Sequence, residues 1–184
     1  MKIVNYNTAA KMIQEGMVGV IPTDTIYGIV SSIYYEEAVD RVYKVKRRNR
    51  DKPCIVLIDK IERLSDLGVD LAEDKTALEI LESVWPGPVS IIFEVREAPW
   101  HLTRGTYSMA FRLPNNDQLL EFLKVSGPVI APSANVEGMG SAISVQEAGL
   151  YFGNEIDFYV DEGERPYFAS RLVKISDGDL ITLR

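Results

Sequence analysis

The sequence predicts a mixed α/β fold, in which one twisted sheet of parallel and antiparallel strands is flanked by helices. Short apolar segments of strand type alternate with amphipathic helical segments along the chain, which is typical of α/β folds. Apolar segments near residue 184 follow one another closely, which favours some antiparallel pairing. No repeat, low-complexity tract or Gly/Ser linker divides the 184 residues, so we expect a single domain over residues 1–184.

Helix and strand signals place the elements of the N-terminal half. Residues 7–16 begin with cap-type residues and close on Gly16, as a short helix does, and residues 17–23 have the β-branched content of a strand. Residues 36–47 carry apolar side chains at helical spacing, which predicts a helix with its later cations outside. Residues 54–58 form a short apolar run that predicts a buried strand.

The C-terminal half continues the alternation of helices and strands. The helix expected over residues 72–85 stops before Pro86, because the residue before a proline disfavours helical geometry. The other expected helices cover residues 115–124 and 144–152. Strands are expected over residues 89–95, 107–113, 158–160, 171–175 and 180–184, and residues 128–135 are expected to be a strand entering a polar loop.

Charge and composition exclude several classes of protein. The net charge of −7 argues against indiscriminate binding to nucleic acid or acidic membranes. No apolar run reaches the roughly 20 residues of a membrane-spanning helix, and no signal-peptide core is present, so we expect a cytoplasmic protein without a membrane partner. The single cysteine, Cys54, is expected to be a buried, reduced thiol.

The positive charge of this acidic chain is concentrated between residues 44 and 52. One interpretation is a solvated end of a helix, where cations favour the helix dipole, and the other is a binding site for an anion. The pattern alone leaves both open. The cations are Lys44, Lys46, Arg47, Arg48, Arg50 and Lys52, and only Asp51 opposes them.

The usual signatures of nucleophilic and metal catalysis are missing. His101 is the only histidine and lies in a segment that resembles a loop, so we expect a surface residue rather than a base. One histidine and one cysteine cannot form a His/Cys metal cluster, and no metal site is expected. Any chemistry should therefore rest on positioning and charge stabilisation.

Polar groups lie where predicted strands run out into loops, the places that often carry ligand sites in open α/β sheets. Each group has a purely structural alternative: a turn, a cap or an ion pair. They are Thr23, Asp24 and Thr25 in PTDTIYGI, Arg112 in FRLP, Ser133 and Asn135 in APSANVEG, and Ser170 in FASRLVKI.

Taken together and in this order, these segments resemble the YrdC-like threonylcarbamoyl-AMP synthases over nearly the whole chain, in the short, single-domain form. The matching segments are PTDTIYGI, Lys46 to Asn49 through Lys52 and Pro53, WPGPVS at 85–90, Arg112 to Pro114, PSANVEG, and Ser170 with Arg171. The resemblance implies a twisted, mixed α/β sheet with a concave, positively charged cavity.

The resemblance also implies an activity. L-threonine, bicarbonate and ATP would give threonylcarbamoyl-AMP and pyrophosphate, with Mg²⁺ accompanying ATP. The product would serve the N6-threonylcarbamoyladenosine modification of tRNA through a downstream threonylcarbamoyl-transferase complex, and a contact with tRNA or double-stranded RNA is a further expectation. By resemblance, Lys46 and Arg48 are catalytic; Thr25, Arg112, Ser133 and Ser170 bind threonine; and Lys46, Arg48, Lys52, Ser108, Asn135 and Arg184 contact ATP.

The sequence departs from the family pattern at four points. Asn49 replaces a proline, Leu57 replaces a frequent histidine, and Arg171 stands where threonine is common and could add another cation to the cavity. Glu137 replaces a serine, and its carboxylate would repel ATP phosphates unless it points away or meets Mg²⁺.

These departures leave alternatives open: a divergent paralogue with another substrate, an RNA-binding module, or a carbamoyl-transfer domain. Glycines and polar residues within 135–144 suggest a mobile lid over ATP.

Overall fold

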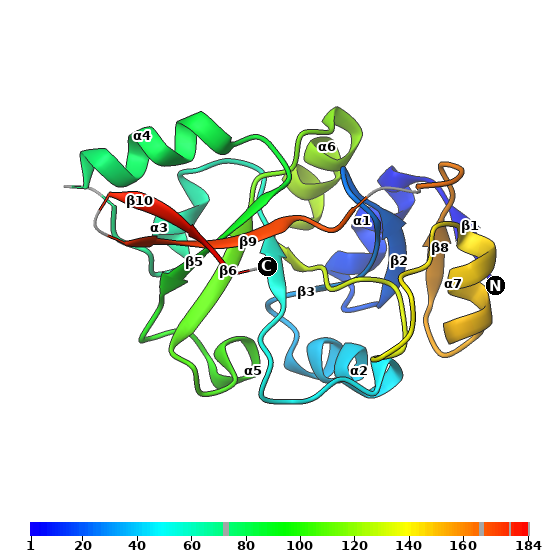
Figure 1. Cartoon of the computed structure of the whole chain (residues 1–184). Helices are drawn as coiled ribbons and strands as arrows, with labels where there is room; N and C mark the ends of the chain where they lie inside the picture. The colour runs from blue at the N-terminus through cyan, green and yellow to red at the C-terminus, as the bar shows by residue number, and fades with distance from the viewer. Residues whose placement is uncertain (72–73, 166–167, 177, 184) are drawn as a thin grey trace.

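A computed structural model of the chain describes residues 1–71, 74–165, 168–176 and 178–183. The strands are Ile3–Val4 (β1), Gly19–Pro22 (β2), Tyr27–Ser32 (β3), Ile55–Leu57 (β4), Val89–Glu94 (β5), Ser108–Arg112 (β6), Val129–Ile130 (β7), Phe158–Val160 (β8), Arg171–Ser176 (β9) and Asp179–Thr182 (β10). Within the described residues they form one ten-stranded sheet in the order β1-β8-β2-β3-β7-β4-β6-β5-β9-β10 (Figure 1).

The sheet is mixed, as the sequence predicts. Strand β8 pairs in parallel with β1 and β2, and the pairs β4–β6 and β5–β9 are also parallel. The pairs β2–β3, β3–β7, β4–β7, β5–β6 and β9–β10 are antiparallel. Strand β8 is second from one edge and β9 is second from the other, so the chain between them must cross the sheet.

Local capping signals fix the ends of several helices. Asn5 caps α1 (Tyr6–Gln14) by accepting from the Thr8 amide at 2.9 Å. In the same way Asn116 caps α6 (Asp117–Ser126), Ser144 caps α7 (Val145–Phe152) and Asp74 caps α4 (Lys75–Val84). None of the helices in the described ranges is long and apolar enough to span a membrane. The helices are Tyr6–Gln14 (α1), Glu36–Lys46 (α2), Arg63–Asp66 (α3), Lys75–Val84 (α4), Trp100–Thr103 (α5), Asp117–Ser126 (α6) and Val145–Phe152 (α7).

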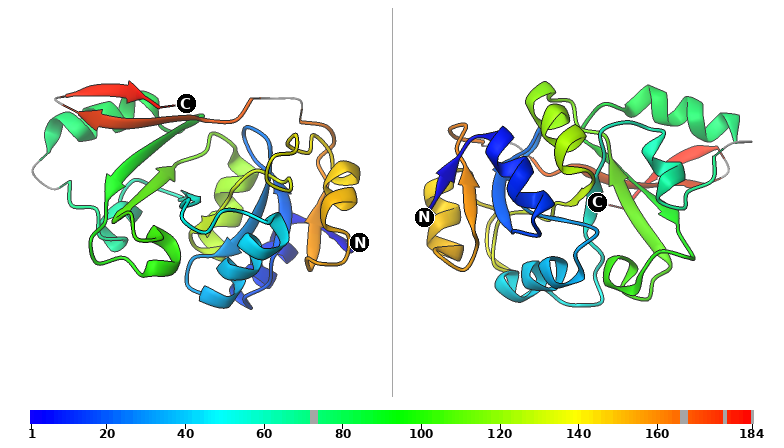
Figure 2. Two further views of the ribbon diagram at one scale, coloured as in Figure 1. Left: turned by 60° about the horizontal axis from the view of Figure 1, so that its bottom comes forward. Right: turned by 180° about the vertical axis from the view of Figure 1, so that it is seen from behind.

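The central strands bury both faces, and successive residues enter different cores. Val20 and Ile29 join the larger apolar cluster, which α2 also contributes to, whereas their neighbours Ile21 and Val30 join the smaller cluster beneath α1 and α6. Helices α1 and α6 contact each other on that second face, as the view from behind shows (Figure 2). The central part of the sheet is therefore covered on both sides.

Strand β3 is the main element that the sequence analysis did not predict. Its run YGIVSS is buried throughout and pairs with β2 in register, with Gly19 opposite Val30 and Pro22 opposite Tyr27. Glycine and two serines hide the alternation that predicts a strand. Because β2 and β3 form a hairpin, residues 23–26 form its tip, and the first three of them are polar.

Candidate functional site

A cavity of about 510 Å³ opens near the middle of the sheet, where the β2–β3 hairpin tip, the ends of β6 and the loop after β7 converge. Five of the predicted site residues lie on its wall together with Arg48: Thr25, Ser108, Arg112, Ser133 and Ser170. The structure thus brings together residues that are up to 145 positions apart in the chain, from Thr25 to Ser170. The lining also includes Thr23, Ile26, Gly28, Pro53, Ile55, Ile92, Thr106, Met109, Ala110, Ala131, Pro132, Ser141, Ala169 and Leu172.

Arg112 is the buried cation of this cavity. It is the last residue of β6, its side chain is 5% exposed, and its Nη2 lies 3.1 Å from Asp24 Oδ1 and 3.3 Å from Thr23 Oγ1. Burial lowers the pKa of Arg112 and the Asp24 carboxylate opposes that effect. Among the described residues, Arg112 Nε and Asp24 Oδ1 have no hydrogen-bond partner of suitable geometry, so the 3.1 Å contact is an ion pair. The guanidinium therefore keeps a donor for an anion.

Hydroxyl groups surround Arg112, and each is held by a neighbour. Thr25 Oγ1 lies 3.0 Å from Thr23 Oγ1, and Ser170 Oγ lies 2.9 Å from Ser90 Oγ in a buried pair. Ser133 donates its hydroxyl to Asn135 Oδ1 at 2.6 Å. The wall therefore carries oriented hydroxyl groups together with the buried Arg112 and, at its border, Arg48, which suits a small polar ligand with a carboxylate.

Two backbone contacts connect the hairpin to the loop that carries Ser133. Ser133 forms an isolated antiparallel bridge with Gly28, and the Ala134 amide donates to the Tyr27 carbonyl at 2.8 Å. A Cβ added at Gly28 would lie 3.5 Å from the Pro132 carbonyl oxygen, so the approach is close but not forbidden. Main-chain bonding therefore sets the separation of the two walls.

Lys46 lies behind this loop, and it is absent from the cavity wall formed by the described residues. Its Nζ donates to the Ser133 carbonyl, to the Asn135 carbonyl at 2.7 Å and to Asn135 Oδ1 at 3.1 Å. Burial, and secondarily Arg48, lowers the pKa of Lys46 to about 8. All three ammonium hydrogens are committed to the loop, so Lys46 here positions Ser133 and Asn135 rather than facing a free anion.

Arg48 and Lys52 form the exposed part of the predicted anion site. Helix α2 ends at Lys46, and the next residue, Arg47, turns the chain with a φ of 51°. Arg48 then donates through Nε to the Lys52 carbonyl at 3.2 Å and through Nη2 to the Pro53 carbonyl at 3.0 Å. The Arg48 side chain thus holds the turn over residues 48–53 together, even though Asn49 stands where the family pattern has a proline. Arg48 also borders the cavity.

The Glu137 carboxylate forms an ion pair with Lys52 of the basic segment. Its Oε1 accepts from Lys52 Nζ at 2.9 Å and its Oε2 accepts from the Asn49 amide at 2.5 Å. The Lys52 ammonium, and then the Asn49 amide, lowers the pKa of Glu137. The sequence analysis considered only a carboxylate that points away or meets Mg²⁺, and this third arrangement was not foreseen.

Of the other residues predicted to contact ATP, Ser108 lies on the described cavity wall and Asn135 does not. Ser108 lines the cavity and donates its hydroxyl to Thr106 Oγ1 at 3.1 Å. Asn135 is 9% exposed and donates from Nδ2 to the Met139 carbonyl at 2.7 Å, so its amide serves the loop. Arg184 lies outside the described residues.

Two residues differ from expectation, and one departure has a structural explanation. His101 is not a surface loop residue: it lies in α5, is 8% exposed, and its Nε2 is 3.0 Å from the Ile33 carbonyl oxygen. A single turn of four residues has too little periodicity to predict. Arg171 is exposed and does not add a cation to the described cavity wall. Leu57 is fully buried opposite Arg112, so it serves the core.

Sequence reasoning undervalued Asp24, Thr23 and Ser90. Asp24 was noted as a polar residue at the hairpin but was given no role, and it is the ion-pair partner of Arg112. Ser90 follows Val89 in a strand and gave no signal until the fold placed it against Ser170. Among the described residues, no group of three or more His, Cys, Asp or Glu side chains could hold a metal ion.

Comparison with known proteins identifies a matching family profile and relatives of similar sequence. A family profile described as "Telomere recombination", which unites Sua5, YciO and YrdC proteins, matches residues 11–184. A threonylcarbamoyl-AMP synthase of Pyrococcus abyssi is 31% identical over 179 residues, which cover 96% of this chain and 52% of that protein. The chain thus spans about half the length of that relative.

Solved structures share the fold. The crystal structure of P. abyssi Sua5 complexed with L-threonine superimposes with a TM-score of 0.90 at 30% identity, over 100% of this chain and 57% of that one. Escherichia coli YciO superimposes with a TM-score of 0.84 at 18% identity, over 100% of this chain and 92% of that one, which shows the fold alone. The profile match, the mixed sheet and these superpositions agree, and the chain belongs to the Sua5/YciO/YrdC family.

Proposed function

We propose that this protein is an L-threonylcarbamoyladenylate synthase, which converts L-threonine, bicarbonate and ATP into threonylcarbamoyl-AMP and pyrophosphate. The observation that carries the proposal is the 510 Å³ cavity, in which buried Arg112 is surrounded by Thr25, Ser133 and Ser170 and bordered by Arg48. A relative of 30% identity has been solved in complex with L-threonine, which supports this choice of ligand.

Arg112 is suited to bind the carboxylate of an amino acid. The guanidinium is fixed by Asp24 on one side and keeps an unpartnered Nε among the described residues. A charged hydrogen bond to a carboxylate is stronger than a neutral one, and a buried guanidinium gains most from it. The hydroxyl groups of Thr25, Ser133 and Ser170 would then test for the threonine side-chain hydroxyl, because an analogue without it leaves buried polar groups unpaired.

The proposed reaction needs charge stabilisation and no covalent nucleophile. Threonine and bicarbonate give N-carboxythreonine and water. An oxygen of the new carboxylate on the threonine nitrogen then bonds to the α-phosphorus of ATP as the bond between that phosphorus and pyrophosphate breaks. Arg48 and Lys52 would offset the growing charge on pyrophosphate, and Ser108 would contact the nucleotide. Mg²⁺ would enter with ATP as part of the substrate, held by phosphate oxygens and water.

Lys46 would contribute by positioning. It holds the main chain at Ser133 and Asn135, so it would orient the loop that contacts both substrates. The same proposal includes contacts of Asn135 and Arg184 with the nucleotide. It also includes delivery of the product to a transferase complex that forms N6-threonylcarbamoyladenosine in tRNA. Since ATP and tRNA are intracellular, we keep the cytoplasm as the expected compartment.

The test is pyrophosphate release from ATP and Mg²⁺ with bicarbonate, comparing L-threonine with L-serine, L-valine and no amino acid. Arg112→Gln should lower kcat/KM for threonine roughly 100-fold, the effect of losing a charged hydrogen-bonded contact of about 3 kcal/mol. Arg171→Gln is the matched control, because Arg171 is an exposed arginine in β9 that does not line the described cavity wall.

Two results would contradict the proposal. Release that needs neither threonine nor bicarbonate, or that is unchanged in Arg112→Gln, would point to a paralogue with another substrate. Binding of double-stranded RNA that weakens steeply with salt, without threonine-dependent release, would favour the RNA-binding alternative.

A further inference from the structure

The Glu137 carboxylate sits where the exposed cations of the site converge. Lys52 Nζ and the Asn49 amide bind its two oxygens at 2.9 and 2.5 Å, and its own amide donates to the Lys46 carbonyl at 2.8 Å. Arg48 is close enough to help lower the pKa of Glu137. The Glu137 carboxylate thus accepts from two donors, one of them the Lys52 ammonium, and lies in the field of a second cation, Arg48.

This arrangement has the chemistry of a phosphate seat. The Asn49 amide follows the left-handed turn at Arg47 and donates to the Glu137 carboxylate, so it is a donor that already binds an anionic group. The ammonium group and the main-chain amide that bind this carboxylate are donors that bind phosphate oxygens in other proteins. The nearby Arg48 guanidinium adds positive charge. The Lys52 and Glu137 side chains are 59% and 32% exposed, so a solute can reach them.

We propose that Glu137 is a built-in competitor that occupies the seat of the ATP phosphate chain and thereby sets the affinity of the protein for polyphosphate ligands. The inference rests on the proposed function, which assigns Arg48 and Lys52 to the triphosphate. When the phosphate chain arrives, the Glu137 side chain leaves Lys52 and the Asn49 amide, and phosphate oxygens take its place. The measured affinity for polyphosphate then reflects the difference between the binding free energies of the phosphate chain and of the Glu137 carboxylate at the same donors.

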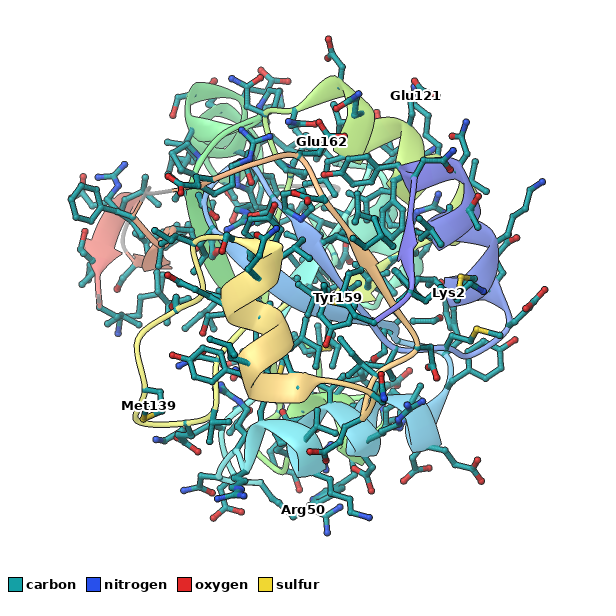
Figure 3. The ribbon with its side chains drawn as sticks, turned by 90° about the vertical axis from the view of Figure 1, so that its right-hand side faces the viewer. Lys2, Arg50, Glu121, Met139, Tyr159 and Glu162 are labelled. Atoms are coloured by element: carbon teal, nitrogen blue, oxygen red, sulfur yellow. The ribbon has the colours of Figure 1, made fainter. Side chains whose placement is uncertain are left out.

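The surroundings of Glu137 permit this exchange. Gly138 has a φ of 88°, and a Cβ built on Gly138 or on Gly140 would meet nothing within 4 Å, so the loop beyond Glu137 borders open space. Met139 at its tip is 58% exposed and points away from the body of the protein (Figure 3). The Met139 carbonyl stays bound to Asn135 Nδ2 at 2.7 Å, so rotation of the Glu137 side chain can free the donors while the loop keeps its anchor.

The test measures binding of tripolyphosphate, ATP and adenosine by calorimetry at fixed ionic strength, with and without Mg²⁺. Glu137→Gln keeps the shape of the side chain and removes its charge. It should raise the affinity for tripolyphosphate and ATP roughly tenfold, the effect of removing one like charge from a partly exposed site, and leave adenosine unchanged. Adding Lys52→Gln should abolish most of the gain, because Lys52 is the charged donor that the Glu137 carboxylate occupies in the wild type.

Glu121→Gln is the matched control. Glu121 also forms a surface ion pair, with Lys124 at 2.6 Å, and lies at the opposite edge of the molecule from Met139 in Figure 3. This variant should bind all three ligands as the wild type does.

Three outcomes would overturn the inference. Unchanged or weaker tripolyphosphate binding in Glu137→Gln would make Glu137 a structural tether. Loss of affinity only with Mg²⁺ would make it a ligand of the metal that accompanies the nucleotide. If neither form binds tripolyphosphate, the anion seat does not exist. By contrast, a tenfold gain without any threonine-dependent pyrophosphate release would uphold the inference and remove the proposed function.

Discussion

Replacing Lys46 with methionine should loosen the loop at residues 133–140 and lower the free energy of unfolding by about 2 kcal/mol. Lys46 is 2% exposed, and its ammonium group binds the Ser133 carbonyl, the Asn135 carbonyl and Asn135 Oδ1. Methionine fills similar space without a donor, so three acceptors lose their partner.

The magnitude follows from two opposing effects, hydrogen bonding and burial of charge. Three hydrogen bonds to a charged group contribute about 1.8 kcal/mol each, near the low end of the usual range, or about 5.4 kcal/mol together. Burial of the ammonium offsets part of this, because lowering its pKa from 10.5 to about 8 corresponds to about 3 kcal/mol. The difference is the expected loss of about 2 kcal/mol.

Urea unfolding measures the stability change, and hydrogen exchange of the ligand-free protein measures the loop. Lys44→Met is the matched control, because Lys44 lies on the same helix and is exposed. Faster exchange at residues 133–140 in Lys46→Met alone would support a positioning role. Unchanged stability and exchange, together with lost ATP binding, would refute the reasoning and return Lys46 to direct contact with the triphosphate.

Three further predictions concern stability and reactivity. Because the pKa of Lys46 is about 8 when folded and 10.5 when unfolded, the unfolded state binds more protons between these values. The free energy of unfolding of the wild type relative to Lys46→Met should therefore rise from pH 8 to pH 10.5 and stay flat below; a constant difference in urea titrations would contradict this. Gly19→Ala should cost roughly 2 to 4 kcal/mol in urea unfolding, since the added Cβ would lie 2.2 Å from the Phe158 ring, and a loss below about 0.5 kcal/mol would count against it. Burial raises the pKa of the Cys54 thiol, so iodoacetamide should label Cys54 only as fast as the protein unfolds; rapid labelling of the native protein would contradict the buried environment.

Amphipathic helices and apolar strands of the fold were predictable from sequence because their signals are local. The helix over 36–47 appears as α2, with its apolar residues in the core and Lys44 exposed. Strand β3 was missed because burial on both faces removes alternation, and its glycine and serines are not strand formers. Strand order was also beyond reach, since β8 and β9 lie near opposite edges although they are close in sequence.

The site was predictable as a set of residues but not as a set of contacts. Motif order brought Thr25, Arg112, Ser133 and Ser170 together, and the structure places all four on one cavity wall. Their partners come from chain crossings that spacing does not encode: Ser90 reaches Ser170 because β5 pairs with β9.

The route of the chain between β8 and β9 has a consequence for synthesis on the ribosome. Ala169, Ser170 and Leu172 complete the cavity wall, and β9 pairs with β5, which is formed some 80 residues earlier. A growing chain therefore exposes β5 as an unpaired edge until β9 emerges, and such edges are prone to wrong pairing. A nascent chain halted before residue 169 would carry Arg112 without the wall that shelters it, so ligand binding should appear only after β9 has emerged and paired with β5.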